Sequence, residues 1–139
     1  MAYLGQREPE FYGTTTAAEL DAKLAAHAKR RGYDLDIFYT HVEGEAIGRI
    51  YRAIEDGVDA LVMNPAAMSY AGYAMRDCLR AVAPKLPYVE VHMSNIEARG
   101  IRSIPGQAAV GIVSGLGVNS YFLALEATLS LLGREAAGG

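Results

Sequence analysis

The segment Tyr88-Val89-Glu90-Val91-His92-Met93-Ser94-Asn95 decides the predicted fold. Its β-branched residues alternate with a carboxylate and an imidazole, which is typical of a buried strand whose last side chains reach a site at its carboxyl end. Glu90 and His92 are two residues apart, so on a strand they share one face and the carboxylate can orient the imidazole. The segment therefore predicts an acid–base site. A histidine that is merely hydrogen-bonded at a strand end is the alternative.

Helical and strand-like patterns alternate along the rest of the chain. Thr16 and Glu19 have the spacing of a capping box, which predicts a helix that Gly32 ends. The patterns predict further helices over 44–54, 70–82 and up to Leu131, and further strands over 35–39, 60–63 and 109–113. Such alternation predicts an α/β fold with a parallel sheet and helices on both faces. Ligands bind at the carboxyl ends of such strands, where Asn64 and His92 fall.

Composition limits the class of protein. A chain of 139 residues with 51% hydrophobic content can bury a core, so we predict one domain over 1–139. The net charge is −3 and the one basic cluster, Lys29-Arg30-Arg31, suits a helix end, so no nucleic-acid partner is expected. No apolar run has transmembrane length and no signal sequence is seen, so we expect a soluble, cytoplasmic protein without a membrane partner. Cys78 is expected to be a buried thiol.

Short motifs are spread along nearly the whole chain. They are Leu4-Gly5-Gln6-Arg7-Glu8-Pro9-Glu10-Phe11-Tyr12-Gly13, His41-Val42-Glu43-Gly44-Glu45, Asn64-Pro65-Ala66, Arg76-Asp77, Glu90-Val91-His92-Met93-Ser94-Asn95 and Gly111-Ile112-Val113-Ser114-Gly115-Leu116-Gly117. In this order they resemble the type II 3-dehydroquinate dehydratase family. Each motif alone is weak, but their order and coverage make the resemblance specific. It implies a flavodoxin-like fold.

The resemblance also implies a reaction. Enzymes of this family remove water from 3-dehydroquinate, giving 3-dehydroshikimate, by anti elimination through an enolate, with no cofactor, metal or Schiff base. The resemblance assigns Tyr12 as the base that takes the proton α to the ketone, and His92, oriented by Glu90, as the acid that protonates the departing hydroxyl. A phenol has an ordinary pKa of about 10, so Tyr12 needs a nearby cation, for which Arg7 and Arg99 match. A structural tyrosine at a turn is the alternative reading of Tyr12.

Further residues match the family's substrate contacts. Ser94, with the backbone amides of Met93 and Ser94, matches the cradle for the substrate carboxylate. Asn64 matches a ligand for ring hydroxyls, although an asparagine before proline is also ordinary turn chemistry. Arg102 corresponds to an arginine that contacts substrate from a mobile loop. Asp77 matches a residue that reaches a neighbouring subunit's site, and a solvated helix face is an equal alternative.

Three departures from the family pattern bear on the exact reaction. Only Met1-Ala2-Tyr3 precede Leu4, where the family has a central strand with a Gly-Pro-Asn turn, so we expect either an upstream segment or a compensating partner. Tyr70 stands where the family has a histidine that binds a ring hydroxyl. The spacing from Arg99 to Arg102 is tighter than in the family, and this loop is the expected lid.

The resemblance thus implies a 3-dehydroquinate dehydratase, a hydro-lyase that forms a homo-oligomer, expected to be a dodecamer built from trimers. Its expected role is in the shikimate pathway of aromatic amino acid biosynthesis or in quinate catabolism. One alternative is a divergent dehydratase acting on a related cyclic hydroxy-keto acid. Another is an inactive homologue that serves as a binding or assembly protein. The joint presence of six family-matching residues argues against the inactive homologue: Arg7, Tyr12, Glu90, His92, Ser94 and Arg99.

Overall fold

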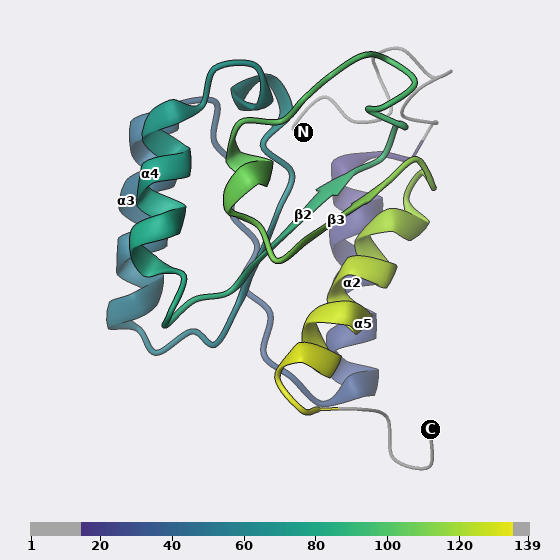
Figure 1. Ribbon diagram of the computed structural model, residues 1–139. Helices are drawn as coiled ribbons and strands as arrows, with labels where there is room; N and C mark the ends of the chain where they lie inside the picture. The colour runs from purple at the N-terminus through teal and green to yellow at the C-terminus, as the bar shows by residue number, and fades with distance from the viewer. Residues whose placement is uncertain (1–14, 135–139) are drawn as a thin grey trace.

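A three-stranded parallel sheet forms the centre of the molecule. The computed structural model shown in Figure 1 describes residues 15–134. Its strands are β1 (Leu61–Met63), β2 (Tyr88–His92) and β3 (Gly111–Ser114), in the spatial order β1-β2-β3. Val89 of β2 lies beside Val62 of β1 and Gly111 of β3. All five residues of β2 are buried, so Glu90 and His92 lie on a central strand inside the core.

Two layers of helices cover the sheet, one on each face. The helices are α2 (Ala17–Arg31), α3 (Glu43–Glu55), α4 (Tyr73–Val82) and α5 (Asn119–Leu131), with short 3-10 helices η1 (Ala66–Ser69) and η2 (Pro105–Ala108). Helices α3 and α4 lie on one face, and α2 and α5 lie on the other (Figure 1). Tyr88 joins the core of α3 and α4, whereas Val89 and Val91 pack against Ala124 of α5. The predicted flavodoxin-like α/β architecture is confirmed.

Helix α2 begins and ends where its local signals predict. The Thr16 hydroxyl accepts a hydrogen bond from the Glu19 amide at 3.1 Å, and the Glu19 carboxylate accepts one from the Thr16 amide at 3.3 Å. This reciprocal pair is the predicted capping box, which satisfies two amides at the start of the helix. Gly32 takes a left-handed conformation with φ 74°, which glycine adopts without a steric penalty and which ends the helix.

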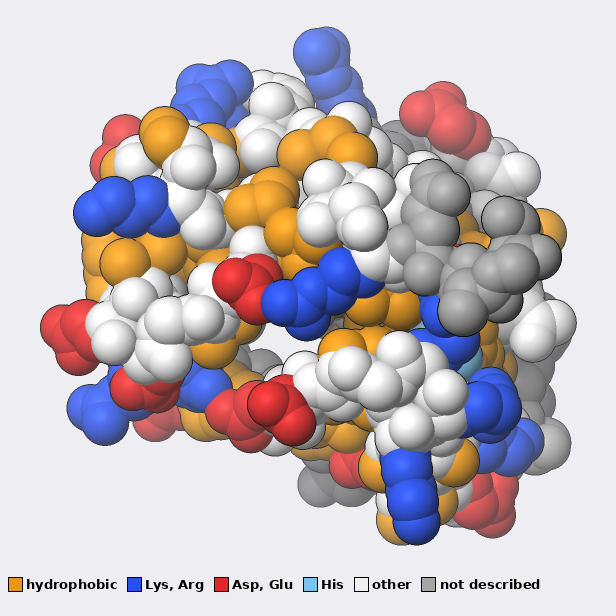
Figure 2. Space-filling view, turned by 90° about the horizontal axis from the view of Figure 1, so that it is seen from below, with side chains coloured by type: hydrophobic (Ala, Val, Ile, Leu, Met, Phe, Trp, Pro, Cys, Tyr) orange, Lys and Arg blue, Asp and Glu red, His pale blue; other side chains and the backbone are white. Residues whose placement is uncertain are grey.

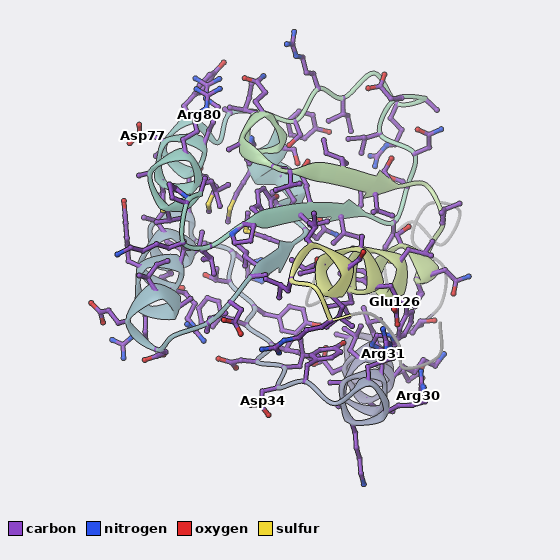
Figure 3. The ribbon with its side chains drawn as sticks, turned by 60° about the horizontal axis from the view of Figure 1, so that its bottom comes forward. Arg30, Arg31, Asp34, Asp77, Arg80 and Glu126 are labelled. Atoms are coloured by element: carbon purple, nitrogen blue, oxygen red, sulfur yellow. The ribbon has the colours of Figure 1, made fainter. Side chains whose placement is uncertain are left out.

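A polar cluster joins α2 to α5. The Arg31 guanidinium donates to both oxygens of Glu126, at 2.8 Å and 2.9 Å (Figure 3). The buried His27 places its Nε2 2.9 Å from Glu126 Oε1 and its Nδ1 2.7 Å from the Tyr33 hydroxyl. The Arg31 hydrogen bonds, and after them that of His27, lower the pKa of Glu126 to about 2. The two helices of this layer are therefore held together by charge-assisted hydrogen bonds as well as by apolar packing.

The strand predicted over 35–39 was wrong. Within residues 15–134, no backbone group of 34–41 hydrogen-bonds to another backbone group, and Ile37, Phe38 and Tyr39 are exposed. A strand needs a neighbour that pairs with its amides and carbonyls, and no described strand lies beside this segment. The outer edge of β1 is also unpaired among the described residues. Seen from below, the described surface is broken by an opening bordered by charged side chains (Figure 2).

Other elements occur as predicted, with shifted bounds. The helix predicted from residue 70 begins at Tyr73, because η1 and a turn occupy the preceding residues. The strand predicted over 109–113 lies at Gly111–Ser114, because η2 extends to Ala108. Cys78 is buried in α4, as expected. Among residues 15–134 there is no helix whose length and apolar character would let it cross a bilayer.

Candidate active site

A small cavity lies where β1 and β2 end. Its volume is about 110 Å³, and its walls come from the segment after β1, the end of β2 and the loop that follows β2. The lining residues are Asn64, Ala66, Ala67, Ser69, Tyr70, His92, Met93, Ser94, Ile96, Arg99 and Ile101. The carboxyl ends of parallel strands are the usual ligand site of such sheets, so the cavity lies at the predicted position. Six predicted site residues line it: Asn64, Tyr70, His92, Met93, Ser94 and Arg99.

Glu90 and His92 are in contact, as their spacing along one strand predicts. Glu90 Oε2 lies 2.8 Å from His92 Nε2, and the Glu90 side chain is completely buried. His92 lines the cavity with only 6% of its surface exposed, whereas Glu90 lies behind it and does not reach the cavity. A carboxylate this close orients the imidazole and sets which of its ring nitrogens faces away from Glu90. No described residue hydrogen-bonds to His92 Nδ1, so this nitrogen is left to face a ligand.

Ser94 and Arg99 form a polar wall beside His92. The Arg99 guanidinium donates through Nη1 to Ser94 Oγ at 2.9 Å. Ser94 is buried directly after β2, and Arg99 reaches it from the loop that follows. A hydroxyl and a guanidinium at one wall can hydrogen-bond a carboxylate, and arginine is well suited to this because its donors form a planar fork.

Asn64 is held in place by two hydrogen bonds. Its Oδ1 accepts from the Ala66 amide and its Nδ2 donates to the Tyr121 hydroxyl, each at 3.0 Å. The first bond is the turn chemistry that an asparagine before proline provides. Ala66 itself has φ 49°, a left-handed conformation that is strained for a residue with a Cβ atom. The turn that shapes this wall of the cavity is thus fixed by Asn64 and by α5.

Two predicted substrate-binding residues that the structure describes, Arg102 and Asp77, do not line the cavity. Arg102 is exposed and does not line it. Asp77 is exposed on the outer side of α4, at the margin of the molecule (Figure 3). Arg7 and Tyr12 lie outside the described residues. The roles given to these four residues therefore stay predictions.

Sequence reasoning missed two polar groups near the cavity. Ser69 lines the cavity, and its buried hydroxyl has no hydrogen-bond partner among residues 15–134. Tyr88 lies behind the cavity and donates from its hydroxyl to Glu90 Oε1 at 2.7 Å. A serine in a connecting segment carries no recognisable signal. The period of two along β2, however, places Tyr88 on the same face as Glu90 and His92 and could have indicated this contact.

The chain's lysines all lie away from the cavity. Lys23 and Lys29 are on α2, and Lys85 is in the loop after α4, so none can form an imine with a ligand in the cavity. Within the described part of the chain, no group of three or more histidine, cysteine, aspartate or glutamate side chains is arranged to hold a metal ion.

Comparison with known sequences identifies close relatives. The family model described as dehydroquinase class II matches residues 1–129. The 3-dehydroquinate dehydratase of Pelobacter propionicus is 44% identical over 131 residues, which are 92% of this chain and 87% of that protein. The 3-dehydroquinate dehydratase of Polynucleobacter asymbioticus is 42% identical over 134 residues, which are 94% of this chain and 89% of that protein.

Solved structures of similar fold also match nearly the whole chain. The type II dehydroquinase from Propionibacterium acnes superposes with a TM-score of 0.85 at 37% identity, covering 93% of this chain and 89% of that one. The type II dehydroquinase from Butyrivibrio crossotus has a TM-score of 0.85 at 30% identity, covering 91% of this chain and 88% of that one. The resemblance therefore extends over sequence, fold and nearly the whole length of the chain.

Proposed function

This chain belongs to the class II dehydroquinase family, and on that premise we propose how its own residues act. The chain is a hydro-lyase that removes water from 3-dehydroquinate and yields 3-dehydroshikimate. The observation that supports the proposal best is the Glu90–His92 pair: His92 lines the cavity, and its Nε2 lies 2.8 Å from the buried Glu90 carboxylate behind it.

The elimination divides between a base and an acid. Tyr12, in its phenolate form, takes the proton from the carbon α to the ketone, and the electron pair moves onto the ketone oxygen as an enolate. The enolate then collapses, the bond between the β-carbon and its hydroxyl breaks, and His92 gives the Nδ1 proton to the departing oxygen, so that water leaves. Glu90 stabilises the imidazolium that makes this transfer possible. Arg7 and Arg99 are the cations proposed to favour the phenolate.

The polar wall of the cavity binds the substrate. Ser94 and Arg99, joined by their 2.9 Å hydrogen bond, hold the carboxylate together with the backbone amides of Met93 and Ser94. Asn64 contacts ring hydroxyls. Its hydrogen bonds to Tyr121 and Ala66 use one hydrogen of Nδ2 and one lone pair of Oδ1, so the second hydrogen and the second lone pair remain for the substrate. Arg102 enters from the loop when it closes. Arginine and serine donors suit this anionic, polyhydroxylated ring acid.

The test of this function is turnover of 3-dehydroquinate, followed by the ultraviolet absorbance of the conjugated ketone that forms. Tyr12→Phe keeps the ring and removes the base, so we expect turnover to fall at least about a hundredfold while binding of substrate is retained. Tyr51→Phe, at an exposed tyrosine of α3, is the matched control and should keep full activity. If Tyr12→Phe keeps more than about a tenth of the activity, Tyr12 is not the base.

Tyr70 supports a test of substrate preference. It lines the cavity with 63% of its surface exposed, where the family pattern has a histidine. A phenol also exchanges hydrogen bonds with a hydroxyl, but it is longer and stays neutral near pH 7. If the natural substrate is a related cyclic hydroxy-keto acid, Tyr70→His should raise kcat/KM for 3-dehydroquinate. Efficient turnover by the unmodified protein, reduced by Tyr70→His, would exclude that alternative.

We further propose that residues 1–139 form one domain of a cytoplasmic homododecamer, with Asp77 contributing to a neighbouring subunit's site. Its exposure on the outer side of α4 leaves it accessible for such a contact. The proposed metabolic role is in the shikimate pathway or in quinate catabolism.

A further inference from the structure

Three side chains of β2 form one line of hydrogen bonds. The Tyr88 hydroxyl donates to Glu90 Oε1 at 2.7 Å, and Glu90 Oε2 lies 2.8 Å from His92 Nε2. Tyr88, Glu90 and His92 alternate along one strand, so they share the face that looks toward α3 and α4. The line runs from the core, where Tyr88 is 1% exposed, to the wall of the cavity at His92.

Tyr88 is the main partner of the inner carboxylate oxygen. Its hydroxyl has one proton, and its other neighbour, the Met63 carbonyl oxygen, is farther away at 3.4 Å. On the remaining side, Gly106 of η2 packs so closely that an added Cβ atom would lie 2.8 Å from Glu90 Oε2. The absence of a side chain at Gly106 is therefore a condition for the carboxylate to keep its place. Burial, and after it the Glu90 charge, raise the pKa of Tyr88 well above its ordinary value, so the phenol stays a donor.

Few other ionisable groups of the described residues face this line. Arg99, from the loop after β2, lines the same cavity as His92. Cys78 of α4 belongs to the same core cluster as Tyr88, and burial raises the pKa of its thiol, so it stays neutral. Tyr121 of α5 packs on the opposite face of the sheet and is bonded to Asn64. The residues of β1, β3 and η2 include no ionisable side chain.

We propose that Tyr88 is a positioning residue that sets the acidity of His92 by holding the far oxygen of Glu90. This inference rests on the role proposed above for His92 as the general acid. Tyr88 touches neither the cavity nor a ligand in it, so its effect must pass through Glu90.

The direction in which Tyr88 shifts the acidity of His92 depends on which protonation state of His92 the Tyr88 hydrogen bond stabilises more. When the His92 imidazolium gives up its proton, it leaves behind a buried carboxylate next to a neutral imidazole. The Tyr88 hydrogen bond stabilises that anionic state more than the ion pair, in which the positive imidazolium already offsets the charge of the carboxylate. Tyr88 therefore makes the pair release its proton at a lower pH. Without Tyr88 the proton is held more tightly, and His92 becomes a weaker acid.

The test is a histidine titration by NMR alongside kinetics. The chain has three histidines, so each ring can be followed separately. Tyr88→Phe removes one oxygen atom, and we expect the His92 titration to move up by about one pH unit, the size that fits a hydrogen bond to a charged group. The limb of the kcat–pH profile that reports His92 should move with it, kcat should fall several-fold and KM should stay within about twofold.

Two further variants distinguish an effect of the Tyr88 hydrogen bond from an effect of Tyr88 packing. 3-Fluorotyrosine placed at position 88 is a stronger donor, so it should move the His92 titration down, opposite to Tyr88→Phe, and it remains informative if Tyr88→Phe does not fold. Tyr33→Phe is the matched control, because it removes a hydroxyl that lies 2.7 Å from His27 and should move only the His27 titration.

The outcomes distinguish this inference from the proposed function. If His92 keeps its titration in Tyr88→Phe and with the fluorinated residue, Tyr88 only packs and the inference is overturned. If the His92 titration moves as expected but the kcat limb does not follow it, Tyr88 does set the acidity of His92, and the role of His92 as the acid is what fails.

Discussion

Ser69, which lines the cavity, has a buried hydroxyl without a hydrogen-bond partner in the described part of the chain. A buried hydroxyl that makes no hydrogen bond costs free energy, and such groups in native proteins call for a functional explanation. A ring hydroxyl or carboxylate of the substrate would satisfy it. The backbone around it is fixed independently, because the Ser69 carbonyl accepts a hydrogen bond from the Ile104 amide at 2.9 Å.

Ser69→Ala should therefore weaken substrate binding without weakening the fold. We expect KM to rise about three- to tenfold, the size of one hydrogen bond, and the thermal unfolding midpoint to stay equal or rise slightly. Ser120→Ala is the matched control, since Ser120 Oγ accepts from the Leu116 amide at 3.0 Å and its loss should lower stability with KM unchanged. An unchanged KM in Ser69→Ala would show that the hydroxyl serves no ligand.

Single residues differ in how far the sequence predicts them. The contact of Glu90 with His92 follows from their spacing on one strand, and the structure confirms it. Tyr121 holds Asn64 from 57 positions away, and a contact of that kind depends on how α5 packs and not on any local pattern. Ser69 is of the same kind, because its burial comes from the packing of η1 beside η2.

The polar cluster that joins α2 to α5 makes the stability of the folded protein depend on pH. The pKa of Glu126 is about 2 in the folded protein, below its ordinary value, so its contribution to stability is fully present above about pH 4.5 and is lost as the pH falls toward 2. Because Glu126 is 42% exposed, we expect the effect to be modest.

Glu126→Gln should lower the thermal unfolding midpoint at pH 7 but change the midpoint little near pH 2, so the two curves of midpoint against pH should converge in acid. Circular dichroism at a series of pH values measures both curves. Asp59→Asn is the control, because Asp59 pairs with Arg134 at 3.4 Å with both side chains largely exposed. Curves that remain parallel down to pH 2 would contradict the role of Glu126.

Elements were predictable where their signals are local. Thr16, Glu19 and Gly32 define α2 without help from the rest of the chain, and the structure begins and ends the helix there. The segment 35–39 has equally clear alternation, yet it is not a strand, because pairing is a property of two segments and no described strand lies beside it. The start of α4 was also missed, because the short helix η1 and a turn occupy the residues before Tyr73.

The whole assembly is tested by light scattering coupled to size-exclusion chromatography. We expect a particle of about twelve times the 14.9 kDa of one chain, and activity that falls when the particle dissociates, because Asp77 of one subunit is proposed to complete the site of another. Asp77→Ala should lower activity within an intact particle, whereas Glu55→Ala, at an exposed acidic residue of α3, should not. A fully active monomer would refute both the assembly and the role of Asp77.

The position of β2 between two paired strands has a consequence for the timing of motion. Amide hydrogens on a buried strand with a neighbour on each side exchange with solvent only when most of the molecule opens. Glu90 and His92 stand on that strand, whereas Asn64 follows β1, whose outer edge is unpaired among the described residues. We therefore expect the backbone amides of Glu90 and His92 to exchange at the rate of global opening, and those that follow β1 to exchange faster.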